Sequence, residues 1–463
     1  MHDSAEIGRV QASSAHTVGV VGGGQLGRMV AEAAAPLGVD VIVVDPTPGC
    51  PASRVAEQIE GGFDDRAAIE ELTRRADAVT VEIELADPDA LAAAAEAHDT
   101  PVHPDPETLR TIRDKLAQTR AFDEAGVPLP AYRAVDDPAD LRAAVETFGE
   151  VMCKARTGGY DGRGNVPVSR DALERDEAFA ERLAAVGAAD GTGAVAEEFV
   201  DFERELSVIG VVGDDEVRTY PPTETIHEAE ILRETLVPAR TTRAVSERAR
   251  SVARDVLSAL DGRGVYGIEL FETTDGEGLL NEVAPRPHNS GHWTIEGTVT
   301  SQFENHVRAV LGLPLGSTAP RGPTATANLL GGERLAELPA SDDDGRVPVV
   351  GFETGVADDV SHDRGSNESG TDGVVLRGLD AVLAAGDAAF HWYGKREVYP
   401  LRKVGHVTVS REWKEKTGDT SESAGDSEVD TSAGGESERR GTPEAVLAAA
   451  RTHTDRLQFD AES

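Results

Sequence analysis

The chain has 463 residues, which at roughly 150 residues per domain predicts three domains. Its net charge of −39, from 45 basic and 84 acidic residues, argues against a nucleic-acid partner and is typical of a surface adapted to molar salt, where the Debye length falls to about 3 Å. No apolar run reaches the length of a membrane span, and two cysteines without a signal-peptide pattern favour a reducing cytoplasm.

The N-terminal region alternates strands and helices. After a polar tail at 1–15, an apolar strand at 17–21 runs into a Gly-x-Gly-x-x-Gly turn, an alanine-rich helix and a second strand that ends at Asp45. The alternation continues with a helix, a strand and a helix, expected at about 65–75, 78–83 and 88–97. The pattern predicts an α/β domain with a parallel sheet, and the turn alone is typical of dinucleotide binding.

A second glycine-rich segment runs from Lys154 to Asn165 and reads Lys-Ala-Arg-Thr-Gly-Gly-Tyr-Asp-Gly-Arg-Gly-Asn. Glycine has no Cβ, so its backbone can approach an anion closely, while Lys154, Arg156 and Arg163 supply positive charge. We interpret the segment as a phosphate-binding loop delivered by the apolar run at 151–153. The alternative is a glycine-rich surface hairpin, which has no need of cations at both ends.

The middle of the chain carries two carboxylates embedded in apolar strands. Before them we expect a helix at about 171–186, a strand at 194–200, a hairpin at 206–220 and a helix at 244–260. The two strands, 266–271 and 278–283, contain Glu269 and Glu282. A buried carboxylate needs a partner, and Mg²⁺ bound together with substrate phosphates is the partner that we expect. The alternative is that both side chains face solvent.

The segment from Ala284 to Trp293 reads Ala-Pro-Arg-Pro-His-Asn-Ser-Gly-His-Trp and is dense in polar groups. Each histidine by itself is more typical of a structural role. Because the segment follows the strand that carries Glu282, we interpret it as the floor of a site.

The last region combines short strands with two segments of disordered composition. Strands are expected at 324–330 and 347–351, and the acidic, serine- and glycine-rich segments lie at 358–372 and 416–442. Lysine is scarce, so the cluster of Lys395, Arg402, Lys403 and His406 is interpreted as an anion site separate from the glycine loop; pairing with nearby acids is the alternative. The predicted boundaries are 16–112, 113–313 and 314–412, then an insertion at 413–442 and a terminal helix at 443–463.

Four motifs carry a family resemblance. They are Gly-Gly-Gly-Gln-Leu-Gly-Arg-Met, Thr-Gly-Gly-Tyr-Asp-Gly-Arg-Gly, Ala-Pro-Arg-Pro-His-Asn-Ser-Gly-His-Trp-Thr and Arg-Lys-Val-Gly-His, at 22–29, 157–164, 284–294 and 402–406. Over about residues 16–410 the chain resembles the ATP-grasp superfamily, and within it the 5-(carboxyamino)imidazole ribonucleotide synthases. The resemblance implies α/β and α+β structure: an ATP-grasp domain with an N-terminal parallel-sheet domain and a small β-rich C-terminal domain.

The resemblance also implies a reaction. ATP and bicarbonate would give carboxyphosphate, which would carboxylate 5-aminoimidazole ribonucleotide in purine biosynthesis. Magnesium, with manganese as the alternative ion, would be the metal, and the protein would be a cytoplasmic homodimer without a membrane partner.

The site residues follow from the same motifs. The resemblance assigns ATP to Lys115, Lys154, Gly159, Tyr160, Asp161, Gly162, Arg163, Gly164, Asn165, Glu197, Glu198, Phe199, Val200, Glu205, His227, Asn281 and Glu282. It assigns catalysis to Tyr160, Asp161, Arg163, Arg286, His288 and Asn289. It assigns the metal to Glu269 and Glu282, and the ribonucleotide to Gly24, Gln25, Leu26, Gly27, Glu82, Lys395, Arg402, Lys403 and His406.

Some positions depart from the family pattern. Lys115 stands where arginine is usual, Thr225 replaces an asparagine, and Tyr399 and Leu401 interrupt a usual Arg-Pro-Gly-Arg-Lys run. Three alternatives stay open: a nicotinamide-dependent oxidoreductase built on the first glycine turn, a non-catalytic ATP-binding module, and another ATP-grasp enzyme such as formate-dependent glycinamide ribonucleotide transformylase or biotin carboxylase.

Overall fold

The computed structural model describes residues 16–158, 164–174, 178–188, 192–332, 335, 346–353, 373–412 and 441–461. The chain divides into two compact units, residues 1–103 and residues 104–463. Among the described residues, no helix combines the length and the apolar character needed to cross a bilayer.

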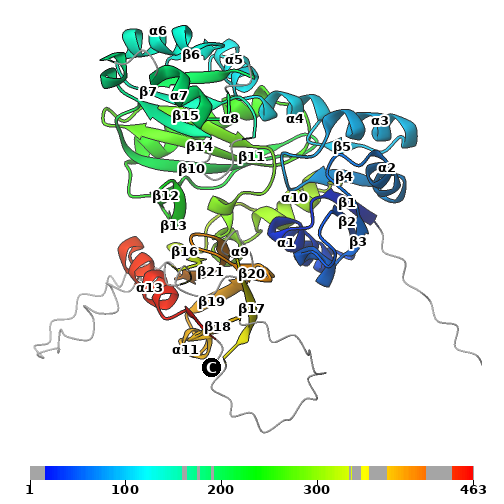
Figure 1. Cartoon of the computed structure of the whole chain (residues 1–463). Coiled ribbons are helices and arrows are strands. Elements are labelled where there is room, and N and C mark those ends of the chain that lie inside the picture. Colours follow the sequence, from blue (N-terminus) through cyan, green and yellow to red (C-terminus); the bar gives the residue numbers. More distant parts are fainter. Residues whose placement is uncertain are drawn as a thin grey trace, which may run out of the picture. The chain divides into compact units, whose positions relative to one another are not determined.

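The first unit is a parallel sheet with helices (Figure 1). Its strands pair in the order β3-β2-β1-β4-β5. The strands are β1 (His16–Val21), β2 (Val39–Asp45), β3 (Glu57–Glu60), β4 (Ala78–Val81) and β5 (Val102–His103). The helices are α1 (Gln25–Ala34), η1 (Ala35–Leu37), η2 (Pro51–Arg54), α2 (Arg66–Arg75) and α3 (Pro88–His98). Asp65 and Asp87 cap α2 and α3 through backbone amides, which explains where these helices begin. The parallel sheet expected from the sequence is confirmed.

The second unit begins with a small antiparallel sheet in the order β6-β9-β7-β8. Its strands are β6 (Tyr132–Val135), β7 (Val151–Ala155), β8 (Asn165–Val168) and β9 (Ala194–Glu198). The helices of this part are α4 (Pro106–Arg113), α5 (Lys115–Glu124), α6 (Pro138–Phe148), η3 (Arg170–Glu174) and α7 (Ala178–Ala185). The helix expected at 171–186 is therefore described as two helical pieces, with 175–177 outside the described residues.

A larger antiparallel sheet of nine described strands forms the centre of the second unit. Its strands are β10 (Phe202–Val212), β11 (Val217–Thr219), β12 (Thr223–Glu228), β13 (Ile231–Val237), β14 (Gly264–Thr273), β15 (Gly278–Ala284), β16 (Thr324–Leu330), β19 (Ala388–Trp392) and β21 (Lys403–Ser410). The order is β15-β14-β10-β12-β13-β16-β21-β19, with β11 beside β10. The helices of this part are α8 (Arg243–Ser258), η4 (Asn289–Gly291), α9 (Thr294–Gly297) and α10 (Gln302–Val310). Strands from the last region thus extend a sheet that begins in the middle of the chain.

The C-terminal part adds a four-stranded sheet in the order β20-β17-β18-β22. Its strands are β17 (Val347–Phe352), β18 (Val374–Arg377), β20 (Glu397–Val398) and β22 (Gln458–Ala461), and its helices are α11 (Leu379–Ala384) and α13 (Pro443–Asp455). The expected terminal helix ends at Asp455, and β22 follows it because Leu457 and Phe459 alternate into a buried cluster with Val374 and Leu376. The segments expected to be disordered are 358–372 and 416–442. The first, and residues 416–440 of the second, lie outside the described residues, whereas Thr442 caps α13.

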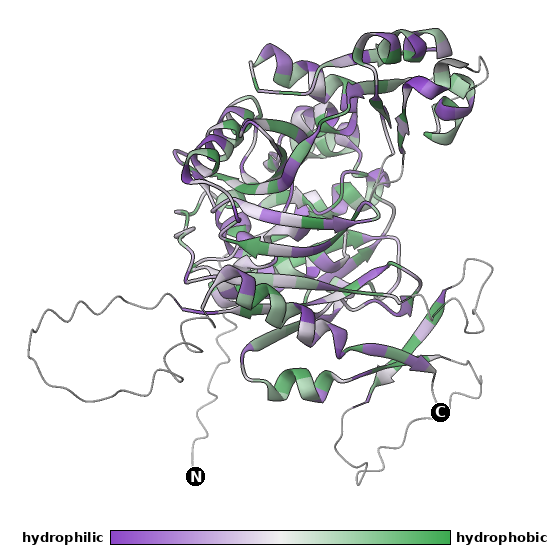
Figure 2. Cartoon of the chain, turned by 90° about the vertical axis from the view of Figure 1, so that its left-hand side faces the viewer, coloured by the Kyte–Doolittle hydropathy of each residue, from purple (hydrophilic) through white to green (hydrophobic). Residues whose placement is uncertain are grey.

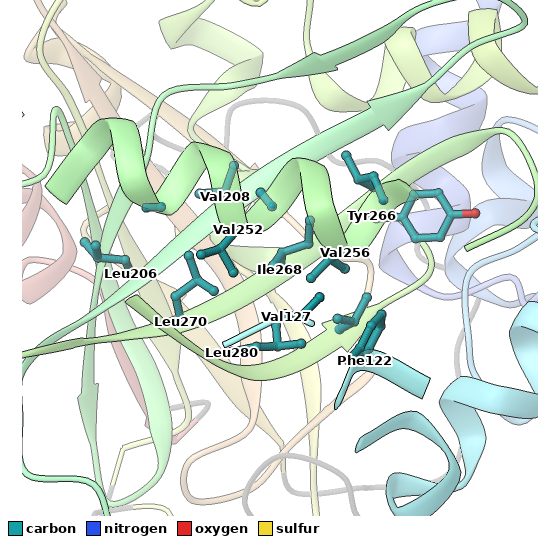
Figure 3. Close-up of a cluster of buried hydrophobic side chains, with 14 of the residues drawn as sticks. Phe122, Val127, Leu206, Val208, Val252, Val256, Tyr266, Ile268, Leu270 and Leu280 are labelled. Atoms are coloured by element: carbon teal, nitrogen blue, oxygen red, sulfur yellow. The ribbon is translucent and has the colours of Figure 1, made fainter. Parts of the chain in front are cut away.

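The faces of the large sheet differ in chemistry. Leu206 and Val208 of β10 and Ile268 and Leu270 of β14 pack with α8 in one hydrophobic cluster (Figure 3). Figure 2 shows that hydrophobic and hydrophilic residues both occur along the strands of the chain. Because successive residues of a strand point to opposite faces, the polar residues between these positions lie on the other face. That face carries the candidate site.

Leu401, one of the two residues that interrupt the Arg-Pro-Gly-Arg-Lys run expected from the family resemblance, has a left-handed backbone with φ of +68°. A side chain in this conformation costs roughly 1 kcal/mol or more, a cost that glycine avoids. We expect Leu401→Gly to be more stable than Leu401→Ala by about 1 kcal/mol, measured by urea unfolding at constant molar salt. At Leu383, an exposed residue of α11, the order should reverse, because glycine is the weaker helix former there. An alanine variant of Leu401 as stable as the glycine variant would contradict the prediction.

Candidate active site

A row of polar side chains crosses four strands of the large sheet. Glu282 of β15 is paired with Glu269 of β14, Glu269 with Ser207 of β10, and Ser207 with Thr223 of β12. Directly paired residues in antiparallel strands point to the same face, so the two carboxylates lie side by side. The sequence predicted both glutamates in strands, and the pairing of β14 with β15 brings them together.

The two carboxylates have opposite pKa shifts. Burial and then the neighbouring Glu282 raise the pKa of Glu269 to about 7. Loss of solvent also acts to raise the pKa of Glu282, but that side chain keeps 48% exposure and its Oε1 lies 2.9 Å from Lys115 Nζ. Lys115, with Lys154 and His288, outweighs the solvent effect and lowers the pKa of Glu282 to about 2. Lys115, at the position where arginine is usual, therefore supplies the charge that keeps Glu282 ionised.

This pair of carboxylates fits a divalent metal. Two like charges on adjacent strands repel each other, and a hard cation between them would remove that repulsion. No group of three or more metal-binding side chains occurs among the residues that the structure describes. A two-carboxylate site that needs ligand oxygens to complete its coordination is the usual protein environment of magnesium.

Lys154 lies at the end of β7, next to the glycine loop. Its side chain is 8% exposed, and its Nζ lies 2.7 Å from Glu197 Oε2 and 3.1 Å from Asn281 Oδ1. A charged lysine is buried this deeply only when it is paired, and here two predicted ATP-binding residues provide the pairing. The structure thus brings Lys154, Glu197 and Asn281 together from three strands.

The glycine loop itself is described only at its two ends. Lys154 and Asn165 pair across β7 and β8, and Ala155 N–H donates to Gly164 O at 2.8 Å. The predicted residues Gly159, Tyr160, Asp161, Gly162 and Arg163 lie outside the described residues. The hairpin arrangement of the flanks is therefore established, and the phosphate-binding role of the loop stays a prediction.

Glu205 and His227 form an ion pair on the same face as Glu269. His227 Nδ1 lies 2.5 Å from Glu205 Oε2. Burial acts to lower the pKa of His227, but Glu205 outweighs that effect and raises it. Glu205 has 24% side-chain exposure, so one partially accessible carboxylate is fixed in position by a histidine.

The segment from Glu197 to Val200 leaves the small sheet. Glu197 is buried against Lys154, whereas Phe199 is 45% exposed. The amides of Glu198 and Phe199 donate to Ala131 O at 2.7 Å and Glu150 O at 3.0 Å. Recognition of a base by this segment would consequently rest on its carbonyls and side chains more than on these two amides.

Of the predicted catalytic residues in the segment after β15, His288 has the most defined contacts. His288 Nε2 lies 3.7 Å from Glu269 Oε1, and His288 Nδ1 lies 2.7 Å from Ser290 Oγ. Burial, followed by the charges of Arg286 and Lys403, lowers the pKa of His288 to about 3. Among the residues that the structure describes, none is a hydrogen-bond partner of the buried Oδ1 of Asn289. The floor predicted from this segment therefore does contact the carboxylate row.

The residues of the predicted basic cluster have different surroundings, and their role in binding the ribonucleotide stays a prediction. The charge of Lys403 acts to lower the pKa values of Glu269, His227 and His288, although those of Glu269 and His227 are raised overall, so Lys403 lies close enough to the carboxylate row to influence it. Arg402 instead lies over the Tyr399 ring, with 5.0 Å from its guanidinium carbon to the ring centroid, and Nη1 donates to Glu397 O at 3.0 Å. Lys395 lies near this turn, between β19 and β20.

His406 is fully buried, contrary to what direct contact with a ligand requires. Its Nδ1 lies 3.0 Å from Tyr393 OH, which is also 3.0 Å from His292 Nδ1. Burial lowers the pKa values of His292 and His406 well below their usual range. His406 belongs to the same strand as Lys403, β21, and its side chain contacts the buried Tyr393.

In the first unit, the glycine turn binds a carboxylate of the protein itself. Gly24 N–H and Gly27 N–H donate to Glu82, the second at 2.5 Å, and Gly23 N–H donates to Asp45 Oδ2 at 2.9 Å. A Cβ on Gly27 would lie 2.6 Å from the backbone oxygen of Gly22, so the turn needs glycine at this position. Glu82 occupies the end of α1 where a dinucleotide-binding protein holds pyrophosphate, which argues against the oxidoreductase alternative. The ribonucleotide contacts predicted for Gly24, Gln25, Leu26, Gly27 and Glu82 stay predictions.

Sequence reasoning missed several residues that support the site. Ser207 is fully buried and its Oγ lies 2.6 Å from Ser290 Oγ, and Gln302 contacts the His288 backbone on both sides. Arg156 pairs with Asp114 instead of extending the cationic loop. A serine between Leu206 and Val208 in an apolar strand was the available signal, since a buried polar side chain must find a partner.

The family comparisons agree with this geometry. Residues 15–113 match the ribonucleotide synthetase preATP-grasp domain, residues 120–303 the ATP-grasp domain, and residues 364–420 the phosphoribosylaminoimidazole carboxylase C-terminal domain. The fold and the site define an ATP-grasp ligase, with an N-terminal parallel sheet and a C-terminal domain of the carboxylase type, which confirms the expected fold class.

Individual relatives show to which family of ATP-grasp ligases the chain belongs. The N5-carboxyaminoimidazole ribonucleotide synthase of Pseudomonas aeruginosa is 41% identical over 394 residues, covering 85% of this chain and 94% of the relative. That of Brucella melitensis is 37% identical over 396 residues, covering 85% and 95%. A solved N5-carboxyaminoimidazole synthase from Aspergillus clavatus, in complex with ADP and 5-aminoimidazole ribonucleotide, has a TM-score of 0.70 at 32% identity and covers 86% of this chain and 94% of that chain. The chain belongs to the N5-carboxyaminoimidazole ribonucleotide synthase family.

Proposed function

We propose that the protein uses ATP and bicarbonate to carboxylate the amino group of 5-aminoimidazole ribonucleotide, in purine biosynthesis. The observation that carries the proposal is the family match over 85% of the chain, to relatives of this activity, together with the carboxylate row of Glu269 and Glu282 beside Lys115. A nonenzymatic ATP-binding module would not need this row.

The residues divide the chemistry among them. Lys154, oriented by Glu197 and Asn281, would bind the phosphates of ATP, and Glu205, oriented by His227, would accept hydrogen bonds from the ribose hydroxyls. Glu269 and Glu282 would hold magnesium, which when bound neutralises charge on the triphosphate. Carboxyphosphate would be the activated species, so the amino group must be in place before it forms.

Four further features of the proposal come from the composition, the buried cysteines and the family resemblance. The charge of −39 supports a protein that works in high salt. Cys50 and Cys153 are buried free thiols, which supports the reducing cytoplasm. The homodimer is proposed from the family resemblance. We also propose the boundaries 16–112, 113–313 and 314–412 as the functional domains.

One experiment tests the activity and separates it from the alternatives. The purified protein is incubated in molar salt with ATP, magnesium and labelled bicarbonate, with and without 5-aminoimidazole ribonucleotide. We expect phosphate to be released and the bicarbonate label to be incorporated into product, and we expect both to depend on the ribonucleotide. ATP binding without turnover would indicate a binding module, and turnover only with glycinamide ribonucleotide and formate, or with biotin, would indicate another ATP-grasp enzyme.

We expect Arg402→Ala to raise the KM for the ribonucleotide tenfold or more, about 1.4 kcal/mol, and to leave the KM for ATP nearly unchanged. Arg402 is fixed by Tyr399 and Glu397 and keeps 25% exposure, so its guanidinium is available to a phosphate. Lys403→Ala should instead affect both substrates, because Lys403 acts on Glu269 and His227.

The matched control for Arg402 is Arg346→Ala, because both guanidinium groups lie 4.0 Å from the Glu397 carboxylate. Steady-state kinetics with each substrate varied in turn gives both constants. Equal losses for ATP and ribonucleotide in Arg402→Ala would point to a folding defect, and an unchanged constant for the ribonucleotide would place its phosphate elsewhere.

A further inference from the structure

His288 is held on several sides by residues to which no role has been assigned. Its backbone N–H donates to Gln302 Oε1 at 3.0 Å, and Gln302 Nε2 donates back to His288 O at 2.7 Å. A Cβ on Gly267 would lie 2.5 Å from His288 Cβ, so β14 closes directly against this residue. The position of the imidazole is thus determined by the backbone of η4, the amide of Gln302 and the face of β14.

The hydrogen bonds of the ring define which nitrogen carries the proton. Ser290 N–H donates to His288 Nδ1 at 3.4 Å, and Ser290 Oγ lies 2.7 Å from the same nitrogen. A backbone amide can only donate, so Nδ1 is the acceptor. The proton of the neutral ring is therefore on Nε2.

Ser207 completes a directed chain of hydroxyl groups. Because Ser290 O–H donates to Nδ1, its oxygen is left to accept from Ser207 Oγ, 2.6 Å away. Both serines are fully buried, so bulk water does not compete for these bonds. The chain runs from β10 through η4 to the ring and favours one tautomer.

The protonated nitrogen faces the site. His288 Nε2 lies 3.7 Å from Glu269 Oε1, beside the paired Glu282. A neutral N–H group at this place can donate to an anionic oxygen without adding charge. The lone pair of Nδ1 already accepts hydrogen bonds from Ser290.

We propose that Ser207 and Ser290 are positioning residues that keep the His288 proton on Nε2, so that His288 donates a hydrogen bond to an anionic oxygen of the reacting groups and does not act as a proton acceptor. The inference rests on the proposed carboxylation. Its new content is the role of the two buried serines and the direction of the hydrogen bond.

Two amide substitutions test the direction. In His288→Gln the side-chain amide nitrogen can take the place of Nε2–H, whereas in His288→Asn it can reach only the place of Nδ1. We expect the glutamine variant to retain at least tenfold more kcat than the asparagine variant, with both folded by circular dichroism in molar salt. Equal activities would overturn the proposal, because a proton acceptor is lost equally in both.

The serines are tested separately. We expect Ser207→Ala and Ser290→Ala to lower kcat tenfold or more while the KM for ATP changes less than twofold. The control is Thr326→Val, which removes a buried hydroxyl from the pair Thr326 and Thr408, 3.0 Å apart in the same sheet and outside the chain of Ser207, Ser290 and His288. A loss of kcat in Thr326→Val as large as in the serine variants would show that losing any buried hydroxyl has this effect. That result would overturn the positioning role of Ser207 and Ser290.

A measurement that needs no turnover separates this inference from the proposed function. Ring ¹⁵N chemical shifts of histidine-labelled protein distinguish protonated from unprotonated nitrogens, and His288→Gln identifies the His288 signals. We expect Nε2 protonated in the native chain and a mixture of tautomers in Ser290→Ala. A proton on Nδ1 in the native chain would refute the inference even if carboxylation is confirmed, and the expected shifts would stand even if carboxylation fails.

Discussion

Glu269→Gln and Glu282→Gln are each expected to lower kcat for ATP cleavage by a factor of about a thousand or more, without unfolding the protein. The loss corresponds to roughly 4 kcal/mol, the scale on which a bound metal stabilises developing phosphate charge. Glutamine keeps the size and one oxygen of each side chain but removes the charge. Glu282→Gln should disturb the charges of the site more than Glu269→Gln, because it also removes the ion-pair partner of Lys115.

The control is Glu277→Gln, which neutralises a carboxylate on the turn between β14 and β15, the same hairpin, where Glu277 pairs with Arg248 at the surface. Single-turnover phosphate release gives the rate, and magnesium titration of ADP binding gives the metal dependence. We expect both to change in the two site variants and neither to change in Glu277→Gln. Turnover near the native rate in Glu269→Gln or Glu282→Gln would remove the metal assignment.

Transfer from molar to dilute salt is expected to destabilise the protein by several kcal/mol and to lower its melting temperature by on the order of 10 °C or more. The reason is self-repulsion of a chain with net charge −39, which ions screen at molar concentration. Thermal unfolding across a potassium chloride series gives the dependence, and activity should decline along the same series.

A neutralised variant separates charge screening from general effects of cosolvent. Glu96, Glu146 and Asp255 are exposed carboxylates outside the site. Glu96→Gln, Glu146→Gln and Asp255→Asn together should raise the melting temperature in dilute salt and leave it nearly unchanged in molar salt. Sucrose, which stabilises proteins without screening, should act equally on both forms. A melting temperature independent of salt in the native chain would refute the halophilic interpretation.

Short-range sequence patterns predicted the strands that carry the site, but they did not predict which side chains are buried. Strands bearing Glu269 and Glu282 follow from two apolar runs with one carboxylate each, and the hairpin flanks of the glycine loop follow from the run before Lys154. The burial of His406 did not follow, because only the packing shows which face of β21 is covered. The separate environments of Arg402 and Lys403 did not follow either, because Arg402 lies in the turn before β21 and Lys403 is the first residue of that strand.

The sequence by itself determined the net charge, the motifs of the family and the two strands that carry Glu269 and Glu282, because each depends on composition or short-range spacing, whereas the candidate ligands of ATP came from the family resemblance. Only the tertiary structure decided that Glu82 occupies the amides of the first glycine turn, that Lys115 keeps Glu282 ionised and that Ser207 reaches Ser290. These contacts join residues 55 to 167 positions apart. Contacts at such separations are set by which strands pair and which faces are buried, and the local periodicity of a sequence does not record either.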